Sequence, residues 1–296
     1  MSHYTPLSYT SSDGLVLHAR DYAAAAVAGI AGAPARLPVI CIHGLTRNAA
    51  DFDEFAPIAA GLGRRVLALD VRGRGLSARD PDPDNYNVQV YADDVAGLMD
   101  RVGMRRAVFV GTSMGGLITM TVASNRLDLV AAAVLNDIGP WLSDKGLARI
   151  AGYVGRPAQV SSWSEAAAHV RELNRCAFPD NSAAEWDKWA RRAFAPDDSG
   201  RLAPRYDPGI ANAMQHGKLR TTSLALRMAF RRLAHERPTL LVRGALSDLL
   251  EAPQAEWMRR AAPGMRYAEV PGVGHAPMLT EPVAVDAITR FLADAP

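Results

Sequence analysis

The sequence predicts an α/β fold: a mostly parallel eight-stranded sheet, covered by helices and interrupted once by a helical cap. Short apolar runs that stop at glycine or polar residues alternate with segments of helical periodicity, which is typical of parallel strands buried on both faces. This alternation is lost after Gly139-Pro140 and returns at Pro238. We therefore expect residues 1–137 and 237–296 to form the core and residues 138–236 to form the cap.

The strands are predicted from composition and from the turns that bound them. Asp13-Gly14 separates two short strand-like segments, which favours an antiparallel edge at the beginning of the chain. The runs that follow are rich in Val, Ile, Leu and Ala and are too short for helices. The eight expected strands cover residues 7–9, 15–18, 37–42, 65–69, 107–110, 130–135, 239–242 and 265–270.

The helices are predicted from apolar residues that recur at helical spacing. In the expected cap, Ser162-x-x-Glu165 and Ser182-x-x-Glu185 are capping-box patterns that mark helix starts. Four of the five tryptophans lie in this segment. The principal expected helices cover residues 114–124, 163–176, 182–194, 219–233 and 283–292. The alanine-rich residues 23–35 are expected to form a surface loop.

Composition excludes several classes of function. Charged residues make up 22% of the chain and the formal net charge is +2, so no nucleic-acid partner is expected. The two cysteines, Cys41 and Cys176, suggest neither a disulfide framework nor a metal site. No apolar segment reaches the ~20 residues that span a bilayer, and no secretory signal pattern is evident. We expect a cytoplasmic, soluble monomer or homodimer.

The strongest chemical signal is Gly111-Thr112-Ser113-Met114-Gly115, which fits G-x-S-x-G between an apolar strand and a helix. A sharp turn from strand to helix exposes the central serine and needs glycine at the neighbouring positions. The serine hydroxyl then lies at a helix N-terminus, where backbone N–H groups can stabilise an anion. Ser113 is therefore the predicted nucleophile.

A nucleophilic serine needs a base and an acid that orients the base. Among the seven histidines, His275 follows the last strand in a glycine-rich loop and fits the chain order Ser…Asp…His. Two carboxylates follow strands at suitable places, Asp248 and Asp137. We expect Asp248 to be the acid and Asp137 to brace the entrance to the cap.

Other residues are candidates for the oxyanion hole and the substrate pocket. The loop after the strand that ends at His43 is expected to bring the N–H of Leu45 beside that of Met114. Arg47 follows in the same loop. The candidate substrate contacts are His43, Arg47, Trp141, Trp163 and Trp186.

These residues together resemble the α/β-hydrolase superfamily. The resemblance rests on His43-Gly44, Asp70-x-Arg72-Gly73-x-Gly75-x-Ser77, the Ser113 motif, Asp248 and Gly274-His275. Arg74 departs from it, because many members have histidine there. Within the superfamily the chain is similar to bacterial carboxylesterases and to 3-oxoadipate enol-lactonases, which share the Ser-Met-Gly-Gly sequence.

The resemblance implies hydrolysis of a small-molecule carboxylic ester through an acyl-enzyme intermediate, with no metal or cofactor. The alternatives are an enol-lactonase, a C–C bond hydrolase of aromatic degradation, and a ligand-binding member of the fold without turnover. A lactonase acting on a dicarboxylate needs an inward-pointing cation, for which Arg47, Arg149 and Arg156 are candidates.

Overall fold

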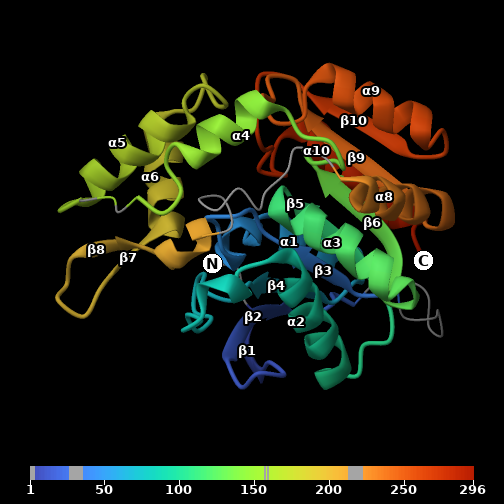
Figure 1. The fold of residues 1–296 in the computed structure, drawn as a ribbon, viewed down its shortest axis with the longest axis horizontal. Coiled ribbons are helices and arrows are strands. Elements are labelled where there is room, and N and C mark those ends of the chain that lie inside the picture. The colour runs from blue at the N-terminus through green and yellow to red at the C-terminus, as the bar shows by residue number, and fades with distance from the viewer. Residues whose placement is uncertain (1–3, 27–35, 157, 159, 213–222) are drawn as a thin grey trace.

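The computed structural model describes residues 4–26, 36–156, 158, 160–212 and 223–296. An eight-stranded sheet runs through the molecule in the order β1-β2-β4-β3-β5-β6-β9-β10 (Figure 1). The β1–β2 and β2–β4 pairs are antiparallel, whereas all the other neighbours are parallel, which confirms the predicted sheet. The strands are β1 (Thr5–Thr10), β2 (Val16–Tyr22), β3 (Val39–Ile42), β4 (Val66–Asp70), β5 (Ala107–Thr112), β6 (Val130–Asn136), β9 (Thr239–Gly244) and β10 (Arg266–Val270).

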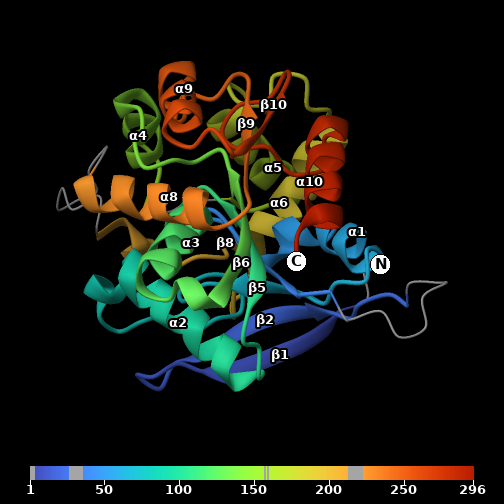
Figure 2. The ribbon, with the colours of Figure 1, turned by 90° about the vertical axis from the view of Figure 1, so that its right-hand side faces the viewer.

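Helices cover both faces of this sheet, as Figure 2 shows along its edge. On one face, α2 (Val88–Arg101), α3 (Met114–Asn125) and α8 (Leu224–Glu236) share a hydrophobic cluster with β3, β4 and β5. On the other face, α1 (Phe55–Gly61) and α10 (Pro282–Asp294) form a second cluster. Every residue of β3, β4, β6 and β9 is consequently buried, which explains why these strands are continuous apolar runs rather than alternating ones.

The chain leaves the sheet after β6 and returns at β9. Between them lie α4 (Asp144–Ala151), α5 (Trp163–Asn174), α6 (Ala183–Ala193) and a short hairpin of β7 (Phe194–Pro196) and β8 (Leu202–Pro204), which the sequence did not predict. Helices α5 and α6 pack together around a small hydrophobic cluster of their own. Helix α8 instead packs on α3, and Phe230 and Leu233 belong to the cluster beside the sheet. The cap boundaries at 138 and 236 stay a prediction.

The two capping-box patterns form to different extents. Ser182 and Glu185 form both reciprocal bonds at the start of α6. At α5, Ser162 accepts from the N–H of Glu165, but the Glu165 carboxylate bonds to Ser161 instead of Ser162. Both serines nevertheless satisfy an otherwise unpaired N–H of a first helical turn, so both helix starts follow the predicted pattern.

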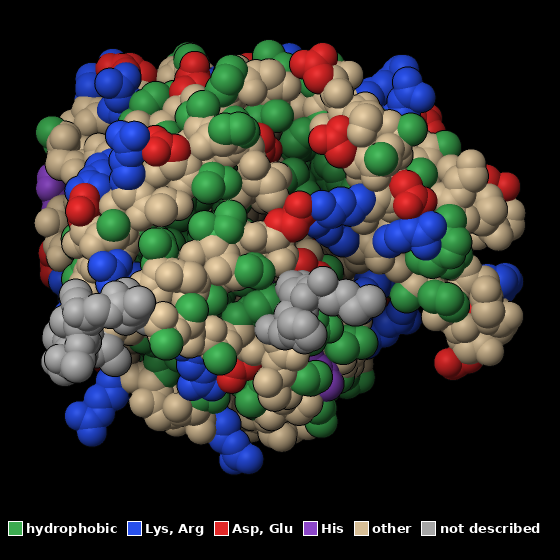
Figure 3. Space-filling view, turned by 180° about the vertical axis from the view of Figure 1, so that it is seen from behind, with side chains coloured by type: hydrophobic (Ala, Val, Ile, Leu, Met, Phe, Trp, Pro, Cys, Tyr) green, Lys and Arg blue, Asp and Glu red, His purple; other side chains and the backbone are tan. Residues whose placement is uncertain are grey.

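On the molecular face in Figure 3, basic and acidic side chains are interspersed rather than separated by sign. Within the described ranges, no helix is both long enough and apolar enough to cross a membrane. Cys41 is buried, Cys176 is exposed, and both are free thiols. Most of the expected alanine-rich loop, and the start of the helix expected from residue 219, lie outside the described residues.

Candidate active site

Ser113 occupies the turn between β5 and α3. Its φ of 52° lies in the left-handed region, which is costly for a residue with a side chain and is typical of functional turns. A Cβ on Gly115 would lie 2.0 Å from the carbonyl oxygen of Ile42, and one on Gly111 would lie 2.4 Å from that of Gly115. The glycines of the motif are thus required because backbone from β3 and α3 approaches them closely.

A continuous hydrogen-bonded chain joins three side chains at the carboxyl edge of the sheet. Ser113 Oγ lies 2.8 Å from His275 Nε2, and His275 Nδ1 lies 2.7 Å from Asp137 Oδ2. The His275 side chain is 8% exposed and that of Asp137 is fully buried. The loop that carries His275 is anchored by Asn136, whose amide donates to the carbonyl oxygen of Pro277.

The expectation that Asp248 orients the histidine is wrong, because Asp137 makes this contact. Asp137 also accepts hydrogen bonds from the Gly244 N–H at 2.9 Å and from the Ser247 hydroxyl at 2.6 Å. Its backbone has a φ of 54°, and its N–H donates to Val242. These contacts hold the carboxylate toward His275 from the end of β6.

Asp248 has a different partner. It forms a two-pronged ion pair with Arg149 of α4, with N–O distances of 2.6 and 2.8 Å. Partial burial acts to raise the pKa of Asp248, but the hydrogen bonds and positive charge of Arg149 outweigh it and hold the pKa below its usual value. This pair joins α4 to the loop after β9 and leaves neither charge free to bind a substrate.

Backbone donors flank the serine. A Cβ on Gly44 would lie 3.6 Å from Ser113 Cβ, so the loop that contains Leu45 passes directly beside the serine. Met114 begins α3, where N–H groups have no partner within the helix. Leu45 and Met114 both border the same cavity as Ser113. The structure therefore brings together the two residues expected to form an oxyanion hole.

Arg74 connects these two residues, a role that the sequence did not suggest. Its side chain is buried, and its Nε donates to the carbonyl oxygen of Leu45 at 3.0 Å. One terminal nitrogen donates to Tyr91, and the other lies 3.5 Å from the sulfur of Met114. The signal in the sequence was an arginine inside a glycine-rich turn, Arg72-Gly73-Arg74-Gly75. Arg74 therefore restrains the peptide that follows Leu45.

His43 borders neither cavity beside Ser113, contrary to the expectation that it is a substrate contact. It is fully buried, and its Nδ1 lies 2.7 Å from the carbonyl oxygen of Gly44 while its Nε2 accepts from the N–H of Val71. Burial lowers the pKa of His43 to about 4 despite the hydrogen bond to Gly44, so the ring is neutral near neutral pH. His43 holds the loop of Leu45 to the end of β4.

The buried neutral His43 makes stability depend on pH. In the unfolded chain His43 binds a proton below its usual pKa of 6.5, whereas in the folded protein it binds one only below about pH 4. The free energy of unfolding therefore decreases as the pH falls between these two values. Between about pH 8 and about pH 5 this loss amounts to about 2 kcal/mol. Urea unfolding at both pH values is expected to show a smaller difference in His43→Asn than in the wild type. Exposed His235→Asn is the control, and an unchanged difference in His43→Asn would contradict this role.

Of the remaining expected substrate contacts, only Arg47 borders a cavity beside Ser113. Arg47 borders a cavity beside Ser113, but its guanidinium is paired with Asp51 and lies 4.1 Å from the ring of Trp189. Trp189 borders the same cavity, although it was not among the expected contacts. Trp141, Trp163 and Trp186 border neither cavity beside Ser113, so the expectation for them is wrong.

The contacts of Trp141, Trp163 and Trp186 explain why these side chains do not border the cavities beside Ser113. Trp186 stacks on Trp189 at 5.6 Å inside the cluster between α5 and α6, which Trp163 also contacts. Trp141 instead lies near the guanidinium of Arg227 on α8. The aromatic residues of the inserted segment therefore serve its own packing, and only an edge of that cluster reaches the site.

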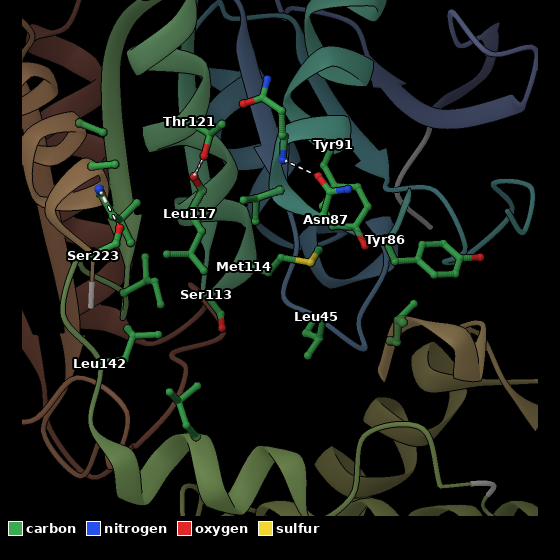
Figure 4. A pocket seen from close by; sticks show the side chains of 18 of the residues that line it. Leu45, Tyr86, Asn87, Tyr91, Ser113, Met114, Leu117, Thr121, Leu142 and Ser223 are labelled. Atoms are coloured by element: carbon green, nitrogen blue, oxygen red, sulfur yellow. Dashed lines mark hydrogen bonds between the residues drawn. The ribbon is translucent and has the colours of Figure 1, made fainter. Parts of the chain in front are cut away.

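Ser113 lies between two cavities. The larger has a volume of about 620 Å³ and the smaller about 120 Å³. Figure 4 shows the Ser113 hydroxyl pointing into the larger cavity, with the side chains of Leu45, Met114, Leu117 and Leu142 around it. His275 borders the smaller cavity, as do Arg47 and Trp189.

Comparison with known proteins agrees with this architecture. The family model described as alpha/beta hydrolase fold matches residues 38–282. The chain therefore belongs to the α/β-hydrolase family, a family of hydrolytic enzymes, which confirms the resemblance read from the sequence.

Individual relatives cover nearly the whole chain. It is 32% identical to the 3-hydroxybutyrate-oligomer hydrolase of Cupriavidus necator over 87% of this chain and 88% of that protein. It is 29% identical to the 2-(acetamidomethylene)succinate hydrolase of Mesorhizobium japonicum over 86% of this chain and 87% of that protein. The crystal structure of an alpha/beta hydrolase from Novosphingobium aromaticivorans superposes with a TM-score of 0.90 at 40% identity, over 99% of both chains.

Proposed function

We propose that this protein hydrolyses carboxylic esters through an acyl-enzyme intermediate on Ser113. The observation that carries the proposal is the hydrogen-bonded chain from Ser113 through His275 to Asp137, with distances of 2.8 and 2.7 Å. A serine in this arrangement has a base within reach of its proton, and the base has a buried carboxylate on its far side.

In the first half of the reaction, His275 Nε2 accepts the proton of Ser113 as Oγ attacks the ester carbonyl carbon. Asp137 holds the proton on Nδ1 and stabilises the imidazolium that forms. The tetrahedral intermediate then collapses, its bond to the alcohol oxygen breaks, and that oxygen takes the proton from Nε2. The acyl group remains on Ser113.

In the second half, His275 removes a proton from water, which attacks the acyl carbon. Collapse of the second intermediate returns the proton to Ser113 and releases the carboxylic acid. In both halves the negative oxygen would be stabilised by the backbone N–H groups of Leu45 and Met114. Arg74 supports this role, because its bond to the Leu45 carbonyl fixes the loop that carries one of these donors.

The charges beside the site favour a neutral ester over a dicarboxylate lactone. Arg47 is paired with Asp51, and Arg149 is paired with Asp248. Arg156 is exposed and does not border either cavity. None of the three arginines considered for a lactonase is thus available as an inward-pointing cation. The 3-hydroxybutyrate-oligomer hydrolase among the relatives adds oligoesters to the substrates that need testing.

A panel of substrates tests the proposal. Purified protein is given p-nitrophenyl butyrate, the methyl ester of a 3-hydroxybutyrate oligomer, an enol-lactone and a vinylogous diketone. We expect hydrolysis of the esters, with a burst of p-nitrophenol stoichiometric with the protein if deacylation is slower than acylation. Faster turnover of the lactone or of the diketone than of every ester would contradict the proposal.

A further inference from the structure

The two cavities that meet at Ser113 differ in which proposed catalytic side chains border them. Ser113 and Leu45 border both cavities, but His275 borders the smaller one. The histidine must come within hydrogen-bond distance of the alcohol oxygen to protonate it as it leaves. The alcohol half of an ester therefore has to lie on the side of the smaller cavity.

The acyl half has a different requirement, because it stays attached to Ser113 Oγ while water enters beside His275. An acyl chain in the smaller cavity would occupy the space that the departing alcohol and the incoming water need. The larger cavity is open to the same serine oxygen (Figure 4). His275 borders the smaller cavity and not the larger one, so an acyl chain in the larger cavity leaves the imidazole accessible. The acyl chain is accordingly assigned to the larger cavity.

The larger cavity is elongated along α3. Met114, Leu117, Thr121, Ser124 and Asn125 all border it, and their spacing places them on one face of the helix. A helix rises about 1.5 Å per residue, so this face extends for about 16 Å from Met114 to Asn125. Figure 4 shows Ser113, Leu117 and Thr121 in succession along α3.

The lining suits an uncharged chain. The opposite walls include Leu147 and Ile150 of α4 and Leu226 and Ala229 of α8. Among the described residues that border this cavity, Asp84 is the one charged side chain, and it accepts a hydrogen bond from Asn212. The described side chains beside the serine, such as Leu45, Met114 and Leu142, are apolar, so a chain that enters there gains hydrophobic contact.

We propose, on the basis of the ester hydrolysis proposed above, that the substrate carries a long aliphatic acyl chain that lies along α3, and a smaller alcohol that leaves through the cavity beside His275. The difference in size between the two halves of the ester follows from the cavity volumes, about 620 Å³ for the acyl chain and about 120 Å³ for the alcohol. A long straight acyl group on a small alcohol fits the site in this orientation, whereas the reversed ester does not.

A steric block in each cavity tests the assignment. Thr121→Trp narrows the larger cavity eight residues beyond Ser113, and Ala193→Phe narrows the smaller one. Thr10→Trp, on the exposed end of the edge strand β1, is the matched control for a new surface tryptophan. Two substrate series are used: p-nitrophenyl acetate, butyrate, octanoate and dodecanoate vary the acyl chain, and the methyl, butyl and octyl esters of octanoic acid vary the alcohol.

We expect the wild type to prefer octanoate or dodecanoate to acetate. Thr121→Trp should lower the ratio of kcat/KM for dodecanoate to that for acetate by about tenfold or more relative to Thr10→Trp. Ala193→Phe should shift the preference among the alcohols and leave the order of the acyl series as in the wild type. Thermal melts identify any variant that is merely unfolded, and the ratios are compared only among folded proteins.

Several outcomes would overturn the assignment. If Thr121→Trp changed alcohol preference and Ala193→Phe changed acyl preference, the two cavities would hold the opposite halves. If neither ratio moved, or if the 3-hydroxybutyrate oligomer ester were a better substrate than dodecanoate, the long aliphatic acyl chain would be wrong while ester hydrolysis itself stood. Absence of hydrolysis with every ester would instead refute the proposed function.

Discussion

Ser113→Ala is expected to reduce ester hydrolysis by a factor on the order of 10⁶ in kcat, because the covalent route through an acyl-enzyme is lost entirely. The protein should remain folded, since the Ser113 side chain contributes one hydrogen bond, to His275, and alanine leaves no buried group of its own unpaired. The measurement is the steady-state rate with p-nitrophenyl butyrate or octanoate, together with a thermal melt.

The matched control is Ser199→Ala, at an exposed position in the connection between β7 and β8. A second readout is mass spectrometry after treatment with a fluorophosphonate, which is expected to add one group to the wild type and none to Ser113→Ala. If Ser113→Ala kept more than about a tenth of the wild-type rate, Ser113 would not be the nucleophile.

Asp137→Asn is expected to lower kcat by a factor on the order of 10⁴. Asparagine keeps the size of the side chain but offers an amide group to His275 Nδ1. If the amide N–H donates to Nδ1, the proton moves to Nε2, and the histidine can no longer accept the proton of Ser113. The measurement is kcat with one p-nitrophenyl ester across a range of pH.

Asp248→Asn is the matched control, because it makes the same chemical change in the loop after the neighbouring strand. It removes the charge that binds Arg149 and leaves the chain from Ser113 to Asp137 intact. We expect its rate to fall by less than about tenfold, accompanied by a small loss of stability, since the ion pair is partly exposed. A larger loss of kcat in Asp248→Asn than in Asp137→Asn would mean that Asp248 orients the histidine during catalysis.

The sequence by itself determined the sheet and the position of the serine, because both depend on local signals. Strands covered on both faces must be apolar throughout, so β3, β4, β5 and β6 are visible as short runs. The turn at Ser113 needs glycine wherever backbone approaches closely, and this leaves a readable pattern. His275 was identified in the same way, from its place in a glycine-rich loop after the last strand.

Only the tertiary structure decided which carboxylate meets His275. Strands β6 and β9 are neighbours in the sheet, and Asn136 pairs with Val242. Asp137 and Asp248 therefore both lie in segments that follow neighbouring strand ends at the same edge of the sheet. Sequence position cannot separate two such candidates. The choice depends on the direction of each side chain, and that is set by the contacts of Asp137 with Gly244 and Ser247 and by the ion pair of Asp248 with Arg149.

The same reason explains the errors about substrate contacts. His43 follows a strand beside the site, but its ring turns inward to bond Gly44 and Val71. Trp163 and Trp186 pack in the separate hydrophobic cluster between α5 and α6. The periodicity of apolar residues in the sequence is the same for a helix that packs in a core and for one that lines a pocket, so it could not separate the two roles. The cavity along α3 is likewise a product of the tertiary structure, because its walls come from α2, α4 and α8, which are separate segments of the chain.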